Sequence, residues 1–170
     1  MINLHQRQAG VLLHVTSLPG PNGIGDFGPD AYSFVDWLQS AGQSLWQWLP
    51  TTPIGPGDSP YQSVSAFAGS PLMVALEPLV AAGWLQALQA PETGFDALRV
   101  NFSTVVPWRL SQLRAAFAGF GLKNAAQERA AFEYWQKREA SWLEDYALFM
   151  ALETENGGKA WWHWPAEVRE

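Results

Sequence analysis

The sequence contains no cysteine, so disulfide bridges, thiolate metal sites and cysteine nucleophiles are all excluded. A chain of this kind fits a reducing compartment, and we expect it to be cytoplasmic. Its first ten residues are mostly polar and show no secretory signal peptide. The longest apolar runs are also far shorter than the ~20 residues that a membrane span requires, so no membrane segment is expected.

Positive charge is scarce as well. Ten Lys and Arg residues stand against 16 Asp and Glu residues, which gives a net charge of −6. Because no basic cluster is present to neutralise phosphates, the sequence argues against binding to nucleic acid or to anionic membranes. Among the three histidines, His5, His14 and His163, no pair has the spacing of metal ligands, and we expect no metal site.

Aromatic residues, in contrast, are abundant. The chain of 170 residues contains 10 Trp, and 14% of its residues are aromatic. Large aromatic side chains mostly belong to a protein core. Those that stay exposed are suited to stacking on flat apolar faces, among which the faces of sugar rings are common.

Two short apolar segments at 11–15 and 44–49 predict strands, and the segment that follows Pro29 has the apolar spacing of a helix that ends at Gly42. Strand, helix and strand in this order predict a βαβ unit with parallel strands. The loops after the two strands, 16–28 and 50–71, therefore emerge at the same edge of the sheet. That edge is where α/β proteins bind ligands.

The remainder of the chain is predicted to be mainly helical, beginning with a helix over 103–120 whose first turn is limited by Pro107. Two capping-box patterns follow, Asn124 with Gln127 and Ser141 with Glu144. They predict separate helices over about 125–137 and 142–155, the second ended by Gly157 and Gly158. We interpret the broad apolar face of that last helix, around Trp142, Tyr146 and Phe149, as core.

Two strands cannot close a sheet, and a (β/α)₈ barrel needs about 250 residues. The sequence therefore predicts an α/β protein in which residues 1–75 form the opening part of a (β/α)₈ barrel. Residues 76–170 are expected to form a mainly helical insertion subdomain that begins the return to the barrel.

The segment Gly23–Gly28 matches the dinucleotide-binding pattern G-x-G-x-x-G. Its first glycine comes eight positions after Val15 instead of within a tight turn, and Asp26 would face a pyrophosphate, so we interpret the glycines as loop residues. Asp26 and Asp58 are the only acids on the two ligand-facing loops. They are the one candidate pair of carboxylates for glycoside chemistry on these loops.

The segment 55–62, with the sequence GPGDSPYQ, places a carboxylate, a hydroxyl, a phenol and an amide on a Gly/Pro scaffold at the ligand-facing edge. A turn alone would explain the glycines and prolines but would not require Tyr61 and Gln62. One aromatic ring beside short polar groups matches the apolar face and the hydroxyls of a sugar. His14, at the end of the first strand, is a further candidate, with a structural histidine as the alternative.

Three sequence blocks occur in order: AGVLLHVTSLPGPNGIGDFG at 9–28, GDSPYQSVSAFAGSP at 57–71 and WLEDYALFMAL at 142–152. Together they resemble the amino-terminal part of the amylomaltases, the 4-α-glucanotransferases also called disproportionating enzymes. The resemblance implies a (β/α)₈ barrel of the α-amylase superclan with helical insertions. It also implies transfer of α-1,4-glucan segments between maltooligosaccharides through a covalent glucosyl-enzyme, without a cofactor.

The resemblance assigns roles to residues of the 55–62 segment. Tyr61 stands where the family stacks a tyrosine on the donor sugar beside the scissile bond, and Asp58 and Ser59 stand where sugar hydroxyls are contacted. Gln62 and His14 are additional candidates for substrate binding. Pro56 occupies a position at which family members often carry a tyrosine, which weakens the case for a second glucan contact there.

The family's nucleophilic aspartate, acid/base glutamate and third aspartate come from later barrel strands, and no residue here matches those motifs. The resemblance therefore implies an amino-terminal fragment that binds maltooligosaccharides and α-1,4-glucans but is inactive alone. Two alternatives stay open. One is a free-standing glucan-binding module that uses Tyr61 without chemistry, and the other is a helical interaction protein that does not respond to sugar.

Overall fold

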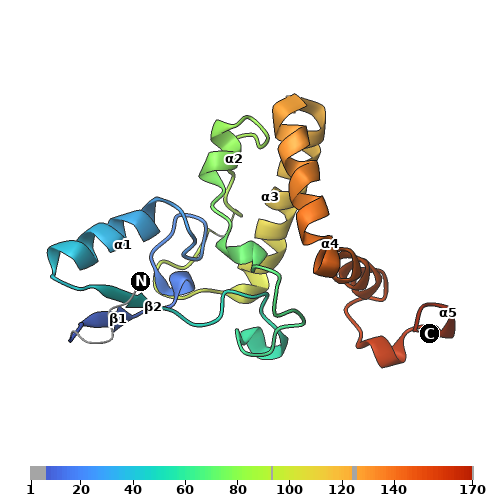
Figure 1. The fold of residues 1–170 in the computed structure, drawn as a ribbon, viewed down its shortest axis with the longest axis horizontal. Helices are drawn as coiled ribbons and strands as arrows, with labels where there is room; N and C mark the ends of the chain where they lie inside the picture. Colours follow the sequence, from blue (N-terminus) through green and yellow to red (C-terminus); the bar gives the residue numbers. More distant parts are fainter. Residues whose placement is uncertain (1–6, 93, 124–125, 170) are drawn as a thin grey trace. The chain divides into compact units, whose positions relative to one another are not determined.

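The computed structural model describes residues 7–92, 94–123 and 126–169. Two parallel strands, β1 (Gly10–Leu12) and β2 (Leu45–Gln47), are connected by helix α1 (Pro29–Ser40), so the predicted strand, helix and strand occur in this order (Figure 1). Both strands are shorter than predicted. The first ends early because a 3₁₀ turn begins at Val15, and the second ends at Gln47, where its pairing with β1 stops.

Helix α1 forms where the sequence predicts it and covers one face of the strand pair. Pro29 stands in its first turn, where a backbone N–H would have no intrahelical acceptor, so the missing N–H of proline is tolerated. Gly42 follows the end of the helix with a φ of 70°. The ring of Phe34 meets the ring of Trp46 on β2 edge to face, at 4.9 Å between centroids. On the opposite face Leu12 is 58% exposed. The strand pair therefore has one covered face and one open face.

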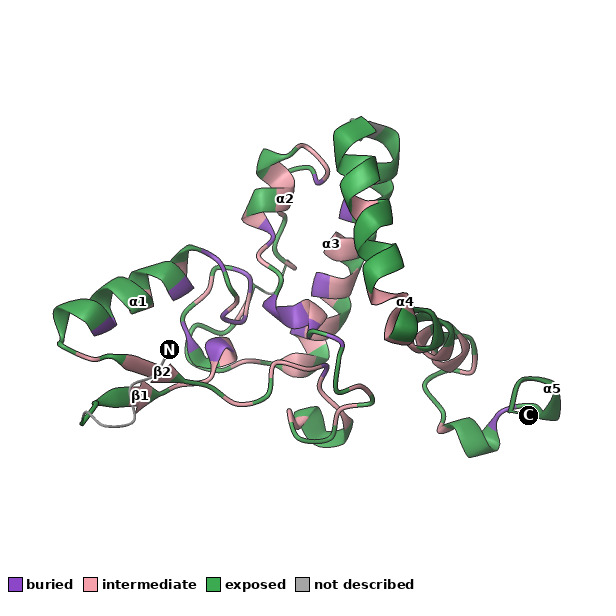
Figure 2. Ribbon diagram, in the orientation of Figure 1, coloured by how far each residue is buried: buried purple, intermediate pink, exposed green. Residues whose placement is uncertain are grey.

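The loops that follow the two strands are held by helix α3 (Phe102–Lys123), which confirms the predicted helix over 103–120. Pro107 lies inside that helix instead of limiting its first turn. Ile24 from the first loop, Leu72 beyond the second loop and Val105 of α3 are each at most 2% exposed and form one cluster. A short helix, α2 (Glu77–Ala81), lies between the second loop and α3 in the sequence. Figure 2 shows buried residues gathered in these loops and along α3.

The structure replaces the last two predicted helices with one continuous helix, α4 (Ala126–Glu155). The predicted break at Ser141 is wrong, because the sequence between Ala126 and Glu155 contains no Gly or Pro to stop a helix ahead of it. The other capping residue, Asn124, lies outside the described residues. The predicted end is confirmed, with Gly157 and Gly158 both at positive φ.

The expected core face of this helix is only half-buried, and no residue described in α4 is buried. A short helix, α5 (Ala166–Arg169), closes the described chain. The chain divides into two compact units, Met1–Asn124 and Ala125–Glu170. The expected boundary after residue 75 concerns the barrel and its insertion, and it stays a prediction. Within the described residues, no helix combines the length and hydropathy needed to cross a membrane.

Candidate functional site

Four of the five predicted site residues lie on one tight turn in the loop after β2. A 3₁₀ turn spans Pro56–Asp58, and the Gly55 N–H donates to the Ser59 carbonyl at 3.0 Å while the Asp58 N–H donates back to Gly55 at 3.1 Å. Gly57 and Asp58 have φ values of 70° and 59°. Asp58 is the one non-glycine residue with a positive φ in the part of the chain that the structure describes. Aspartate tolerates this conformation better than most residues do.

Gly55 is required at the base of this turn. A Cβ at this position would lie 1.7 Å from the carbonyl oxygen of Gln62, so no other residue fits without moving the backbone. Because the backbones of Gly55 and Gln62 approach so closely, the segment 55–62 is a closed loop with little freedom. A closed loop of this kind fixes the backbone positions from which its side chains project.

The side chains of the loop point outward. Tyr61 is 70% exposed, and Asp58 and Gln62 are exposed as well. Ser59 is half-buried, and its hydroxyl oxygen accepts a hydrogen bond from the Tyr61 N–H at 3.3 Å. An exposed aromatic ring next to a carboxylate, a hydroxyl and an amide can stack on one sugar while it hydrogen-bonds to that sugar's hydroxyls.

The fifth predicted residue, His14, lies on the loop after β1. The two strands are parallel, and the Leu13 N–H donates to the Gln47 carbonyl at 2.9 Å, so both loops leave the sheet at the same edge. Burial lowers the pKa of His14 below its usual value of 6.5. Its Nδ1 atom is buried and has no hydrogen-bond partner in the described part of the chain. His14 is therefore a neutral imidazole at neutral pH.

Asp26 is engaged in an ion pair that the sequence did not suggest. The Nη2 atom of Arg109, on α3, donates to Asp26 Oδ2 at 2.9 Å, and the Gly28 N–H donates to Asp26 Oδ1 at 2.9 Å. Burial raises the pKa of Asp26, and the Arg109 guanidinium opposes that rise. Because both carboxylate oxygens are occupied, the structure gives no support to Asp26 and Asp58 as a catalytic pair.

The glycines of the G-x-G-x-x-G segment serve the packing of the loop. A Cβ on Gly25 would lie 2.2 Å from the Val15 carbonyl oxygen, so the backbone of Gly25 packs against protein instead of leaving space for a phosphate. A cleft of about 840 Å³ runs beside this loop, with Thr16, Ser17 and Asp30 among its polar lining residues. None of the described residues forms a metal-binding cluster.

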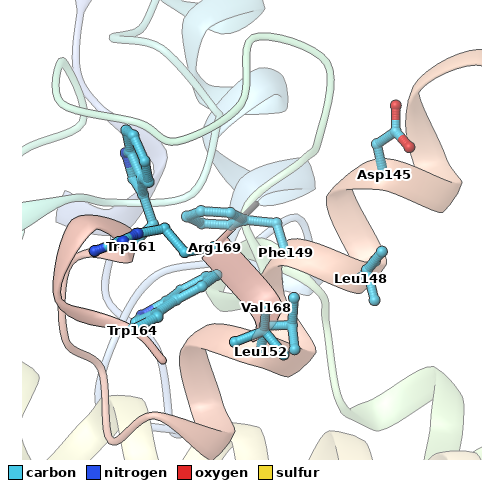
Figure 3. Close-up of a pocket in the computed structure, with 8 residues that line it drawn as sticks. All are labelled: Asp145, Leu148, Phe149, Leu152, Trp161, Trp164, Val168 and Arg169. Carbon is cyan, nitrogen blue, oxygen red and sulfur yellow. The ribbon is translucent and has the colours of Figure 1, made fainter. Parts of the chain in front are cut away.

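A separate hollow of about 400 Å³ lies within the unit that contains α4 (Figure 3). Trp164 is 6% exposed, its ring packs 5.4 Å from that of Phe149, and its indole N–H donates to the Lys159 carbonyl at 2.7 Å. Apart from Asp145 and Arg169, the lining is apolar. This hollow offers only two charged side chains, whereas the loop 55–62 combines an exposed ring with a carboxylate, a hydroxyl and an amide, so the loop is the stronger candidate.

Comparison with known proteins gives a consistent result. A family model described as 4-alpha-glucanotransferase matches residues 13–170. The 4-alpha-glucanotransferase of Thermus thermophilus is 48% identical over 164 residues, which cover 96% of this chain and 32% of that protein. The chloroplastic/amyloplastic 4-alpha-glucanotransferase of Solanum tuberosum is 38% identical over 170 residues, 96% of this chain and 29% of that protein.

Among solved structures, the amylomaltase from Streptococcus agalactiae in complex with acarbose is similar, with a TM-score of 0.85 and 37% identity. The match covers 96% of this chain and 33% of that one. The chain thus spans about a third of the length of the relatives that it matches.

Proposed function

This chain belongs to the 4-alpha-glucanotransferase family, and from that premise we propose that it forms the amino-terminal third of an enzyme that transfers α-1,4-glucan segments between maltooligosaccharides. The reaction proceeds with retention through a covalent glucosyl-enzyme. In this proposal the chain supplies part of the sugar-binding cleft, and the rest of the enzyme supplies the catalytic carboxylates.

The strands and α1 are proposed to be the first βαβ unit of a (β/α)₈ barrel, within residues 1–75, with residues 76–170 as the helical insertion. The arrangement of the strand pair supports this. Val11 and Trp46 are register partners and share the face that α1 covers, whereas Leu12 belongs to the open face. In a barrel, helices cover the outer face and further strands enclose the inner one.

The observation that carries the proposed function is the exposed ring of Tyr61 on a closed loop at the carboxyl edge of parallel strands. We assign Tyr61 to stacking on a glucose ring, Asp58 and Ser59 to contacts with sugar hydroxyls, and Gln62 and His14 to the edges of the same cleft. Acarbose, which occupies the similar amylomaltase of Streptococcus agalactiae, is an oligosaccharide analogue of the proposed ligand class.

The test measures sugar binding and turnover separately. Calorimetric titration of the purified chain with maltoheptaose should show binding, and incubation with maltotriose should give neither glucose nor longer glucans, because a covalent route needs a nucleophile and an acid. Replacing Tyr61 by alanine should weaken maltoheptaose binding roughly tenfold, since partial burial of the apolar ring face against a sugar contributes on the order of 1.4 kcal/mol. Tyr61→Phe keeps the ring and should retain most of the affinity.

Tyr134 provides the matched control, because this tyrosine of α4 is 68% exposed and lies in the other unit. Tyr134→Ala should bind maltoheptaose as the original chain does. Equal affinity of the Tyr61→Ala and Tyr134→Ala variants would remove Tyr61 from the site. Disproportionation of maltotriose by the chain alone would refute the assignment of the carboxylates to the rest of the enzyme.

A further inference from the structure

Arg109 is a fully buried arginine at the point where the two ligand-facing loops meet α3. Its side chain is 0% exposed, and its Nη2 atom donates both to Asp26 Oδ2 at 2.9 Å and to the Val74 carbonyl oxygen at 2.5 Å. Asp26 belongs to the loop after β1, and Val74 follows the end of the loop after β2. One nitrogen of one side chain therefore bridges the first loop and the segment that follows the second.

The contacts around the ion pair extend this bridge. The Phe27 N–H donates to the Met73 carbonyl at 3.1 Å, so the two segments that Arg109 joins are also bonded to each other. The rings of Phe27 and Trp48, the first residue after β2, meet edge to face at 6.1 Å between centroids. Asp26 in turn accepts from the N–H of Gly28, the residue immediately before α1.

The segment around Val74, which Arg109 contacts, continues directly from the loop that carries Tyr61. The Ser70 N–H donates to the Thr51 carbonyl at 2.7 Å, which closes the base of the loop, and the Ser70 hydroxyl oxygen accepts from Leu72. Three residues lie between Ser70 and Val74, whose carbonyl oxygen accepts from Arg109. Arg109 is thus linked through Val74 and Ser70 to the base of the loop from which the turn 55–62 projects.

The surroundings of the Arg109–Asp26 ion pair are not those that would maximise folding stability. The Nε and Nη1 atoms of Arg109 are buried and have no hydrogen-bond partner in the described part of the chain, and the same holds for one carboxylate oxygen of Glu77. A buried ion pair often adds little to stability compared with apolar packing, and unsatisfied donors lower its contribution further. Functional sites are where such local costs are commonly found.

We propose that Arg109 is a positioning residue that fixes the loop carrying Tyr61 relative to the loop carrying His14, and that it thereby sets the affinity of the cleft for maltooligosaccharides. This inference rests on the proposed function. Arg109 touches no sugar in this scheme. Its effect passes through the Val74 carbonyl and the Asp26 carboxylate.

The experiment titrates the full chain and three variants with maltoheptaose by calorimetry, after circular dichroism has shown that each is folded at the temperature used. Arg109→Met removes the donors, Arg109→Lys keeps the charge but cannot reproduce the planar guanidinium, and Asp26→Asn keeps an acceptor for Gly28 while it removes the charge. Arg114→Lys is the matched control, since Arg114 is exposed on the same helix.

A positioning role predicts that Arg109→Met weakens binding roughly tenfold or more, because the apparent affinity falls with the fraction of molecules whose loop is correctly placed. Arg109→Lys should bind more tightly than Arg109→Met but less tightly than the original chain. The affinity of Asp26→Asn should lie between those of the two Arg109 variants, and Arg114→Lys should bind as the original chain does. Amide hydrogen exchange at 59–62 and at 14–17 should be faster in the Arg109 variants while exchange in α4 is unchanged.

Folded Arg109 and Asp26 variants that bind maltoheptaose with unchanged affinity would overturn the proposal, as would exchange that accelerates evenly through the unit. If Arg109→Met does not fold, Arg109→Lys and Asp26→Asn decide between these outcomes. Failure of the original chain to bind maltoheptaose would instead refute the proposed sugar site itself. Accelerated exchange in the variants would then show loop positioning without a sugar function.

Discussion

His14 makes the folding stability of this chain depend on pH. Burial lowers its pKa in the folded state below 6.5, so as pH falls through 6.5 the unfolded chain takes up a proton that the folded chain does not. Stability should therefore decline until the lower folded pKa is passed. His14→Gln should lose less stability than the original chain between about pH 7 and pH 5, measured by urea unfolding.

Asp26 contributes a slope of opposite sign, because its pKa is raised by burial and the folded chain binds that proton first as pH falls. The contribution of His14 is therefore the difference in slope between the original chain and His14→Gln. His163→Gln is the control, since His163 is exposed. An unchanged slope in His14→Gln would show that the buried imidazole is not the group responsible.

The structure of residues that contact mainly their neighbours in the sequence was predictable from the sequence. The turn at 55–62 is specified by its own glycines and prolines, and its prediction as an exposed polar loop needed no knowledge of the rest of the fold. The ion pair of Asp26 with Arg109 joins residues 83 positions apart. Arg109 occurs in a helical segment with no charge pattern to single it out, so only the packing of α3 on the loops could identify it.

Helix α4 shows that a capping pattern alone does not start a helix. The pair Ser141 and Glu144 matches a capping box, but Ala140 and Arg138 on its amino-terminal side are good helix formers, and the helix continues through. A cap is effective only where the preceding backbone leaves the helix. Ser141 instead lies in a helix interior, exposed to solvent.

Whether Ser141 is a helix cap or an interior helix residue determines the sign of the stability change when it is replaced by alanine. Ser141→Ala should raise the free energy of unfolding by about 0.5 kcal/mol, because alanine is the better interior helix former. Were Ser141 a cap, the same change would lower that energy by about 1 kcal/mol. Thermal unfolding followed at 222 nm distinguishes the two, and Ser141→Gly, which should destabilise the helix in either case, shows that the method responds to this position.

The elements around the sheet were predictable in type but not in length. The apolar run from Val11 to Val15 predicts five strand residues, whereas the strand ends at Leu12 and Val15 begins a 3₁₀ turn. Strand length depends on the partners that pair with it, and β1 has one pairing strand among the described residues. The apolar run of β1 is typical of a strand covered on both faces and does not indicate which face α1 covers; that depends on the packing of Phe34 on Trp46, which leaves Leu12 exposed.

At the scale of the whole chain, the described residues cover the strand pair on one face only, and substitutions on its two faces should differ sharply. Trp46 is half-buried among Phe34 and Trp48, and its indole N–H donates to the Leu13 carbonyl at 2.8 Å. Trp46→Ala should lower the free energy of unfolding by about 3 kcal/mol. Leu12→Ser, on the open face, should change it by no more than about 0.5 kcal/mol.

Denaturant unfolding of the two variants at one protein concentration measures both effects. The size of the Leu12 effect is the informative quantity, because a face that a barrel would enclose is open in this chain. A loss of several kcal/mol for Leu12→Ser would mean that something covers the open face in solution. Light scattering of the original chain would then show whether a second copy is the cover, since pairing of exposed strand faces and edges between chains would raise the measured mass.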